Sequence, residues 1–269
     1  MEHIIGVIGG GHMGSAMIGG ILHAGVAEKK QILASCRSEK TKERLVQEFG
    51  IVASLDNREV ASSADILLLA VKPYQLEDVI SQIRDVVRRE TVVVSVAAGK
   101  SIEQMKKMFG GKVLLVRAMP NTPALVGEAM SALSPDDGMG EEQLATVCRI
   151  FESFGKVEVV PESLLDVVVG VSGSSPAYVY LFIEAMADAA VADGMQREQA
   201  YVFAAQSVMG AAKMVLETGE HPGTLKDAVC SPGGTTIEAV AKLEEGGFRH
   251  AVIEAQRACV QKSKELGRQ

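Results

Sequence analysis

The sequence lacks features that would point to particular classes of protein. Its 27 Lys and Arg residues are outnumbered by 34 Asp and Glu, which gives a formal net charge of −7. Because a protein that binds duplex DNA or RNA needs clustered Lys and Arg to displace counterions, this balance argues against a nucleic-acid partner. The five histidines are isolated, without HExxH spacing, so we expect no metal site.

Long apolar runs and cysteine pairs are missing as well. No apolar run approaches the roughly 20 residues needed to cross a bilayer, and the N-terminal MEHIIGVIGGG has no basic region typical of a signal peptide. Cys36, Cys148, Cys230 and Cys259 are scattered without a CxxC pair, which fits reduced thiols. We therefore expect a soluble, cytoplasmic protein with no membrane partner.

The first part of the chain has an α/β pattern. Up to about residue 160, short runs rich in Val, Ile and Leu alternate with amphipathic stretches. This alternation predicts a parallel sheet with helices on both faces, a Rossmann-like doubly wound domain over residues 1–160. The expected strands are 3–8, 31–36, 65–71, 91–96 and 112–119, with two closing strands at 129–134 and 156–160; an expected helix covers 75–89.

After Pro161 the strand patterns vanish. Residues 177–194 and 200–219 are typical of long helices that each end at a glycine, and they are apolar around most of their circumference. A helix without a proper polar face must be buried on several sides. We predict an all-α domain over 161–269 that forms part of an oligomer interface; a monomeric helical lobe is the alternative.

A glycine-rich segment follows the first expected strand. In GVIGGGHMGSAM, residues Gly9, Gly11 and Gly14 have GxGxxG spacing and open a helix. In a dinucleotide-binding fold the first glycine permits the tight turn, the second lets the pyrophosphate approach the backbone, and the third allows close packing of the helix. A glycine-rich turn with no ligand is the alternative.

The end of the second expected strand bears on the choice of cofactor. An NAD site usually carries Asp or Glu there, but this chain has ASCRS, with Ser35, Arg37 and Ser38. A guanidinium and two hydroxyls suit a 2′-phosphate, so the sequence favours NADPH over NADH. If Arg37 is only a solvated loop residue, both cofactors remain possible.

The stretch DAVCSPGGTTIEAV, residues 227–240, predicts one helix ending, a Pro-Gly-Gly turn and another helix starting. Unpaired N–H groups after Gly233 and Gly234, with the hydroxyls of Thr235 and Thr236, would make an anion site at the helix start. An ordinary turn with threonine as N-cap is the alternative.

Several motifs occur in a fixed order: GVIGGGHMGSAM, AVKP, SVAAG, MPNTP, GVSGSSPAY, HPGTLKDAVCSPGGTTIEAV and GGF. With them the chain closely resembles the pyrroline-5-carboxylate reductase family from residue 4 to about 265. The resemblance implies reduction of L-1-pyrroline-5-carboxylate to L-proline, the last step of proline biosynthesis, with NADPH or sometimes NADH. It also implies a Rossmann domain followed by a helical dimerisation domain, with dimers often assembled into decamers.

The resemblance also implies site residues. Together with the residues argued above, the cofactor contacts are Ile8, Gly9, Gly10, Gly11, His12, Met13, Gly14, Ser35, Arg37, Ser38, Asn57, Ala70, Val71, Lys72, Pro73, Ala97, Ala98 and Gly99. The substrate contacts are Glu162, Gly233, Gly234, Thr235 and Thr236. Thr236 is the candidate to orient or protonate the imine nitrogen, with Glu162 on the amine side. The active site would combine elements of both domains, in an intertwined dimer from different subunits.

Other assignments stay open at this point. Lys72 could be an acid or a substrate clamp, or simply bind phosphate or solvent. Asn121 and Thr122 could shape the nicotinamide edge or be purely structural. A β-hydroxyacid dehydrogenase is a rival, but it would carry a lysine in the segment GVSGSSPAYVYLFIEAMADAA, which has none. A non-catalytic NADPH sensor is the second rival, and it would not need a carboxylate site.

Overall fold

The computed structural model describes residues 3–111 and 113–267. Internal packing divides the chain into two compact units. Met1–Ser174 together with Cys259–Gln269 form the first, which we call the sheet unit, and Ser175–Ala258 form the second, the helical unit. The two units are described separately below.

The sheet unit is built on one eight-stranded sheet with the order β3-β2-β1-β4-β5-β6-β7-β8. Its strands are β1 (Ile5–Ile8), β2 (Ile32–Ser35), β3 (Val52–Ser54), β4 (Ile66–Leu69), β5 (Val92–Ser95), β6 (Leu114–Met119), β7 (Ala129–Pro135) and β8 (Gly155–Val159). Neighbouring strands are parallel except at one place, where β6 and β7 are antiparallel. The doubly wound α/β class expected from the sequence is therefore confirmed, with the last two strands reversed.

The reversal follows from the length of the connection before β7. A parallel crossover needs about a dozen residues or more, usually with a helix. Only the segment 120–128 joins β6 to β7, and most of it is the short 3-10 helix η3 (Thr122–Val126). The chain can therefore only return alongside β6 in the opposite direction.

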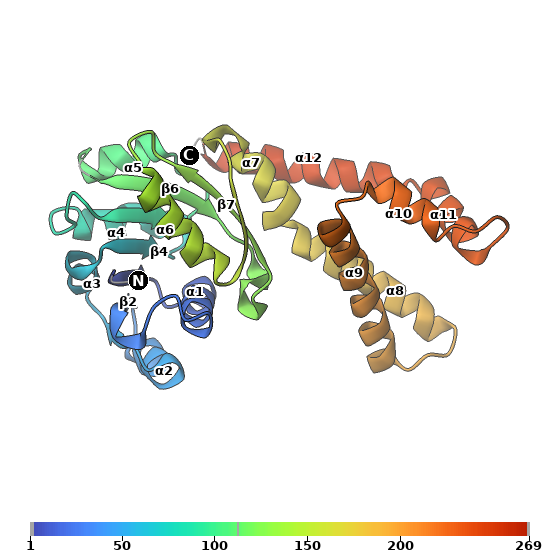
Figure 1. The fold of residues 1–269 in the computed structure, drawn as a ribbon, viewed down its shortest axis with the longest axis horizontal. Coiled ribbons are helices and arrows are strands. Elements are labelled where there is room, and N and C mark those ends of the chain that lie inside the picture. Colours follow the sequence, from blue (N-terminus) through green and yellow to red (C-terminus); the bar gives the residue numbers. More distant parts are fainter. Residues whose placement is uncertain (1–2, 112, 268–269) are drawn as a thin grey trace. The chain divides into compact units, whose positions relative to one another are not determined.

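Helices cover both faces of this sheet (Figure 1). One apolar core lies on the side of α1, α2 and α6, and the other on the side of α3, α4 and α5. These helices are α1 (His12–His23), α2 (Glu39–Phe49), α3 (Asn57–Ser63), α4 (Leu76–Ile83), α5 (Ile102–Phe109) and α6 (Glu141–Glu152). Because both faces are covered, strands β1, β4 and β5 are buried at every position, which explains their mostly apolar sequences.

The sheet unit ends in a helical segment. The 3-10 helix η4 (Glu162–Leu164), α7 (Leu165–Val168) and the π-helix η5 (Val169–Gly173) follow one another without a break. Leu165 is buried and packs with Met119 of β6 and Ala132 of β7. This contact explains why residues 162–174 belong to the sheet unit, although the sequence-based boundary was placed after residue 160.

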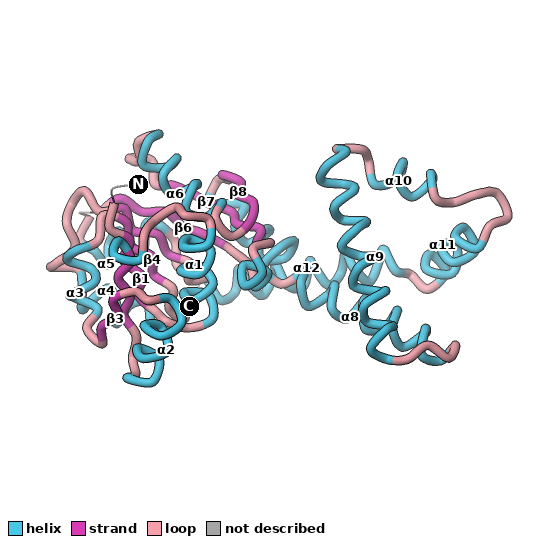
Figure 2. The backbone as a smooth tube through the Cα atoms, turned by 60° about the horizontal axis from the view of Figure 1, so that its bottom comes forward, coloured by secondary structure: helices cyan, strands magenta, loops and turns pink. Residues whose placement is uncertain are grey.

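The helical unit contains helices and loops, and the strands of the described chain all belong to the sheet unit (Figure 2). Its helices are α8 (Ser175–Ala192), α9 (Arg197–Thr218), α10 (Pro222–Ala228), α11 (Thr235–Glu245) and the first half of α12 (Phe248–Gly267). The helices expected at 177–194 and 200–219 correspond to α8 and α9, which pack against each other. An all-α C-terminal region is thus confirmed.

Two local features differ from what the sequence predicts, and one expectation falls partly outside the described residues. β3 was missed, because its three residues are too few to show a pattern. The helix expected over 75–89 ends at Ile83, after which Val86 N–H bonds to Ile83 O in a turn. The strand expected over 112–119 is β6, but residue 112 lies outside the described residues.

The expectation that no segment could span a bilayer was too strict. The helical run Glu162–Ala192 has 31 residues and a mean hydropathy of 1.3 over its best window. By length and composition alone it is long and apolar enough to cross a membrane. The same properties are found in helices that pack against protein, so they do not by themselves identify a membrane span.

Candidate active site

A cleft lies at the carboxyl ends of β1 and β4, where the winding of the sheet changes direction. One cavity there has a volume of about 440 Å³ and a second about 260 Å³. Both are lined by Gly11, Ala70, Val71 and Lys72, so the two cavities adjoin. This switch point is where open α/β sheets bind their ligands.

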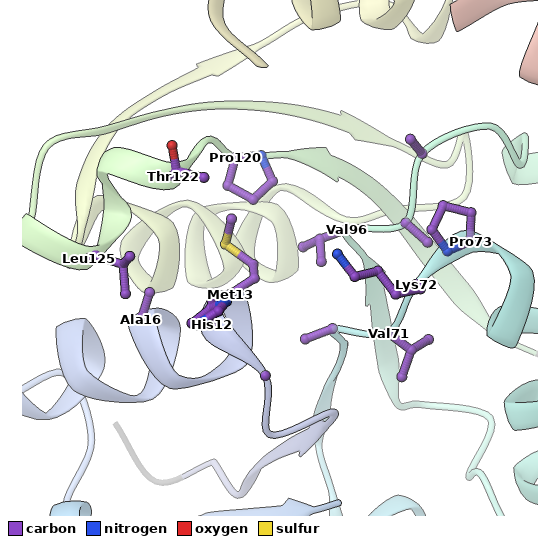
Figure 3. A pocket seen from close by; sticks show the side chains of 14 residues that line it. His12, Met13, Ala16, Val71, Lys72, Pro73, Val96, Pro120, Thr122 and Leu125 are labelled. Atoms are coloured by element: carbon purple, nitrogen blue, oxygen red, sulfur yellow. The ribbon is translucent and has the colours of Figure 1, made fainter. Parts of the chain in front are cut away.

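The larger cavity is a mostly apolar slot (Figure 3). His12 and Met13 come from the first turn of α1, and Val96 follows β5. The Lys72 side chain extends into the slot, and Pro120 and Thr122 form its far rim. A slot of this kind can hold a flat ring against backbone and small side chains.

The smaller cavity is lined by polar groups around the N-terminus of α2. Arg37 and Thr41 line it, while Ser38 caps α2 by accepting a hydrogen bond from Thr41 N–H at 3.3 Å. Ser35 is fully buried, and its hydroxyl donates to Asn57 Oδ1 at 2.8 Å. A helix N-terminus beside an unpaired basic loop residue is suited to a phosphate group.

The glycine turn between the cavities has the geometry that a dinucleotide requires. Gly9 has φ of 113°, and a Cβ there would lie 2.4 Å from the Ala70 carbonyl oxygen, so a larger residue cannot replace it. Beside Gly11 a Cβ would have no atom within 4 Å. The open space at Gly11 faces the cleft and leaves room for a ligand to touch the main chain.

The structure brings most of the expected cofactor residues to this cleft. The residues that line one cavity or both are Ile8, Gly9, Gly10, Gly11, His12, Met13, Ser35, Arg37, Asn57, Ala70, Val71, Lys72, Pro73, Ala97 and Ala98. Gly14, Ser38 and Gly99 do not line it. Gly99 has φ of 85° and packs near Leu266 at the end of α12.

Other lining residues were not anticipated. They are Ala16, Val96, Pro120 and Leu125 in the larger cavity, and Cys36, Thr41, Gln75 and Val79 in the smaller one. Burial raises the pKa of the Cys36 thiol, so at neutral pH this residue contributes a neutral wall rather than a thiolate. Most of these residues are apolar and carry no sequence signal beyond their place after a strand.

Asn121 and Thr122 have different roles, although they are adjacent. Thr122 lines the larger cavity. The buried Asn121 side chain instead donates to Ser172 O at 3.0 Å and accepts from Met130 N–H at 2.9 Å. Asn121 therefore holds the rim in place from behind, joining it to the π-helix and to β7.

Glu162 lies at a separate cavity of about 610 Å³. Its Oε1 accepts hydrogen bonds from Arg117 Nη1 and from Ile102 N–H, both at 2.8 Å. Since these contacts join β6, α5 and the start of η4, the carboxylate has a structural role within the sheet unit.

The second expected site lies in the helical unit. Gly233 has φ of 66°, and Gly234 N–H bonds to Ser231 O at 3.0 Å, which closes the turn before α11. The expectation of an unpaired N–H directly after Gly233 was therefore wrong. Gly234 is the N-cap of α11, so Thr235 and Thr236 occupy its first turn. The N–H groups of a first helical turn have no partner within the helix and can bind an anion.

Comparisons with known proteins agree with this geometry. Residues 162–266 match the family model described as pyrroline-5-carboxylate reductase dimerisation, and residues 4–99 match the one described as NADP oxidoreductase coenzyme F420-dependent. A pyrroline-5-carboxylate reductase of Escherichia coli strain K12 is 53% identical over 268 residues, covering 100% of both chains. This chain belongs to the pyrroline-5-carboxylate reductase family.

Other relatives and structures give the same result. A pyrroline-5-carboxylate reductase of Methanosarcina acetivorans is 45% identical, with 98% of each chain covered. The structure of a Coxiella burnetii pyrroline-5-carboxylate reductase has a TM-score of 0.93 at 34% identity and covers 99% of both chains. A Plasmodium falciparum pyrroline carboxylate reductase, solved with NADP bound, has a TM-score of 0.89 at 32% identity over 99% of this chain and 98% of that one.

Proposed function

We propose that this protein reduces L-1-pyrroline-5-carboxylate to L-proline with NADPH, the last step of proline biosynthesis. The observation that carries the proposal is the 53% identity to a reductase of that name over the full chain. The cleft and the α11 turn supply the two kinds of site that such a reaction needs, one for a dinucleotide and one for a carboxylate.

The cofactor fits the residues of the cleft. The open backbone at Gly11 suits the pyrophosphate, the apolar slot beside Val96 suits the nicotinamide, and Arg37 at the start of α2 suits the 2′-phosphate. When bound, NADPH supplies a hydride to the imine carbon of the substrate. The contribution of the chain is to hold the ring and the substrate at the right distance. NADH, which lacks the 2′-phosphate, would be accepted less well.

The substrate carboxylate binds at the start of α11. The N–H groups of Thr235 and Thr236 in the first turn of α11 bind it, supported by the partial positive charge of the helix N-terminus. Thr235 contributes its backbone N–H. The Thr236 hydroxyl orients the imine nitrogen, which must be protonated as it becomes an amine. Threonine is a weak acid, so its role is to orient a protonated imine rather than to act as a strong acid.

The assay is NADPH oxidation with pyrroline-5-carboxylate, compared with hydroxyacid and keto-acid substrates. Turnover of the cyclic imine alone is expected, and its absence would reject the proposal. Thr236→Ala should lower kcat by roughly tenfold to a hundredfold, since a single orienting contact is lost. Thr236→Ser should restore much of the loss, and Thr235→Ala, which keeps its N–H, is the matched control. Near-normal turnover of Thr236→Ala would remove this role.

Glu162 stays a predicted substrate contact on the amine side. Its pairing with Arg117 also supports a positioning role, and Glu162→Gln separates the two. A contact to the substrate amine would raise KM for pyrroline-5-carboxylate, whereas a structural role would lower thermal stability with KM unchanged.

We further propose that the chain forms homodimers that assemble into a decamer in the cytoplasm. Support for the dimer is the match of residues 162–266 to the dimerisation family. The decamer rests on the resemblance alone, and sedimentation velocity would distinguish the two assemblies. We also propose that residue 160 marks the end of the cofactor-binding domain in functional terms.

A further inference from the structure

Helix α2 lies directly against the glycine turn of the cleft. A Cβ at Gly10 would be 2.8 Å from Leu45 Cδ1 and 2.9 Å from Thr41 Cγ2, so the Gly10 backbone packs directly against these two α2 side chains. Arg44, which lies one turn after Thr41 on α2, reaches back over this contact. Its Nη2 donates to the Gly10 carbonyl oxygen at 2.7 Å and to Ser15 Oγ at 3.0 Å.

This contact fixes the orientation of one peptide group. In a trans peptide the C=O and the following N–H point in opposite directions, and the described chain contains no cis peptide bond. When Gly10 O points towards Arg44 on α2, the N–H of Gly11 points away from α2. Gly11 lines both cavities of the cleft, and the space beside it is open.

We propose that Arg44 is a positioning residue for dinucleotide binding: by holding the Gly10 carbonyl, it presents the Gly11 N–H to the cofactor pyrophosphate. Without the guanidinium, the Gly10–Gly11 peptide is free to turn its carbonyl oxygen towards the cleft, where it would repel the phosphate oxygens. The same nitrogen bonds to Ser15 on α1, so the turn and the helix that follows it are held together.

The positive charge of Arg44 also favours binding of the negatively charged pyrophosphate, but this attraction is partly screened. Its Nη1 donates to Glu48 Oε2 at 2.8 Å, and the Arg44 side chain is 44% exposed. Solvent and the Glu48 carboxylate therefore screen the guanidinium, and we attribute the effect to orientation of the peptide more than to long-range attraction.

NADPH and NADH should respond differently to the loss of Arg44 and to the loss of Arg37. The pyrophosphate is common to NADPH and NADH, whereas the 2′-phosphate belongs to NADPH alone. Loss of Arg44 should weaken both cofactors by the same factor. Loss of Arg37, which lines the adenosine end of the cleft, should weaken NADPH alone.

The test is isothermal titration of the protein with NADPH, NADH and 2′-AMP, which has no pyrophosphate. For Arg44→Ala we expect Kd for NADPH and NADH to rise by roughly tenfold each, the value of one hydrogen bond to a charged donor, with Kd for 2′-AMP unchanged. Arg44→Lys, which keeps a charged donor group, should have Kd values between those of this variant and the wild type. It also tests the proposal if Arg44→Ala does not fold.

Arg88 provides a matched control. Its side chain is 41% exposed, and it also donates to a backbone carbonyl, Ala64 O at 3.0 Å, and to a carboxylate, Asp65 Oδ1 at 2.7 Å. It lies by the start of β4, at the opposite end of that strand from the cleft. Arg88→Lys and Arg88→Ala should leave all three Kd values unchanged. Unchanged NADPH binding in Arg44→Ala, or equal weakening of 2′-AMP, would overturn the proposal.

Discussion

The two units of this chain bury their apolar residues in different ways. In the sheet unit many large apolar side chains are fully buried, among them Phe151, Phe154 and Leu68. In the described part of the helical unit the buried residues are alanines, namely Ala187, Ala200 and Ala204. Large apolar side chains there are exposed instead, with Leu181 at 67% and Phe203 at 66%. The sheet unit thus contains its own core, whereas the helical unit leaves large apolar side chains uncovered within the single chain.

The family match explains this difference. Residues 162–266 match a dimerisation family, and we therefore expect a second copy to cover the exposed apolar surface of α8 and α9. Contact with a second copy also accounts for the apolar character of Glu162–Ala192, which is long and apolar enough to cross a membrane by length and composition alone. A helix that packs against its own unit and against a partner needs apolar residues around most of its circumference.

The largest expected effect comes from a charge placed in this surface. Leu181→Asp would bury a carboxylate without a partner at the dimer interface, and in a two-fold interface the change occurs twice. We expect the dimer to weaken by about 4 kcal/mol or more, roughly a thousandfold in Kd. Light scattering after gel filtration would show a monomer in place of the oligomer.

A matched substitution in the sheet unit controls for exposure. Val52 on the edge strand β3 is 60% exposed, close to the value for Leu181. Val52→Asp should leave the oligomer unchanged, because the core of the sheet unit lies inside it. If both variants dissociated, or neither did, the contrast between the two units would be wrong.

The next effect tests the self-contained core. Leu68 is fully buried in the middle of β4, within the core on the α1 side. Leu68→Ala should lower the free energy of unfolding by about 2–5 kcal/mol, through lost burial and the cavity left behind. Urea unfolding followed by circular dichroism measures it. Val52→Ala, at an exposed position, should lower the free energy of unfolding by less than about 0.5 kcal/mol. A decrease as small as that for Leu68→Ala would show that the core is loosely packed.

Elements with a local sequence signal could be predicted from the sequence, in both units. Strands, the glycine turn and the long helices were found because their signals are local: unbroken apolar runs, GxGxxG after a strand, and apolar helices ending at glycine. β3 has three residues and so shows no such pattern. The reversed direction of β7 depends on the length of the connection from β6, which is visible in the sequence only once both strands are assigned.

The site was predicted less completely because many of its contacts join distant residues. Arg44 lies 34 positions from Gly10, and Arg117 lies 45 from Glu162. Both arginines sit in segments that are otherwise typical of an exposed helix or a buried strand. Their role depends on how α2 packs on the turn and how β6 meets η4. No sequence motif indicates how these elements pack against each other.

The smallest expected effect concerns the pH dependence of the sheet unit. Burial alone would raise the pKa of the Asp65 carboxyl, but the Ile4 N–H at 2.7 Å and the Arg88 guanidinium together lower it below the ordinary value of 3.8. Because the pKa is lower in the folded state, the ionised carboxylate stabilises the fold at pH values above 3.8. This stabilisation is lost as the pH falls through the folded-state pKa. Asp65→Asn should therefore cost about 1 kcal/mol at pH 7 and little in strong acid.

Glu245 in the helical unit is the comparison for Asp65. Its ion pair with Lys242 joins side chains that are 70% and 77% exposed, so Glu245→Gln should leave stability unchanged at either pH. Urea unfolding of both variants at pH 7 and near pH 3 measures the difference, at protein concentrations high enough to keep the oligomer intact. If Asp65→Asn lost as much stability in acid as at pH 7, the carboxylate would not be the group that joins β1 to β4, and the acid sensitivity of the sheet unit would have another source.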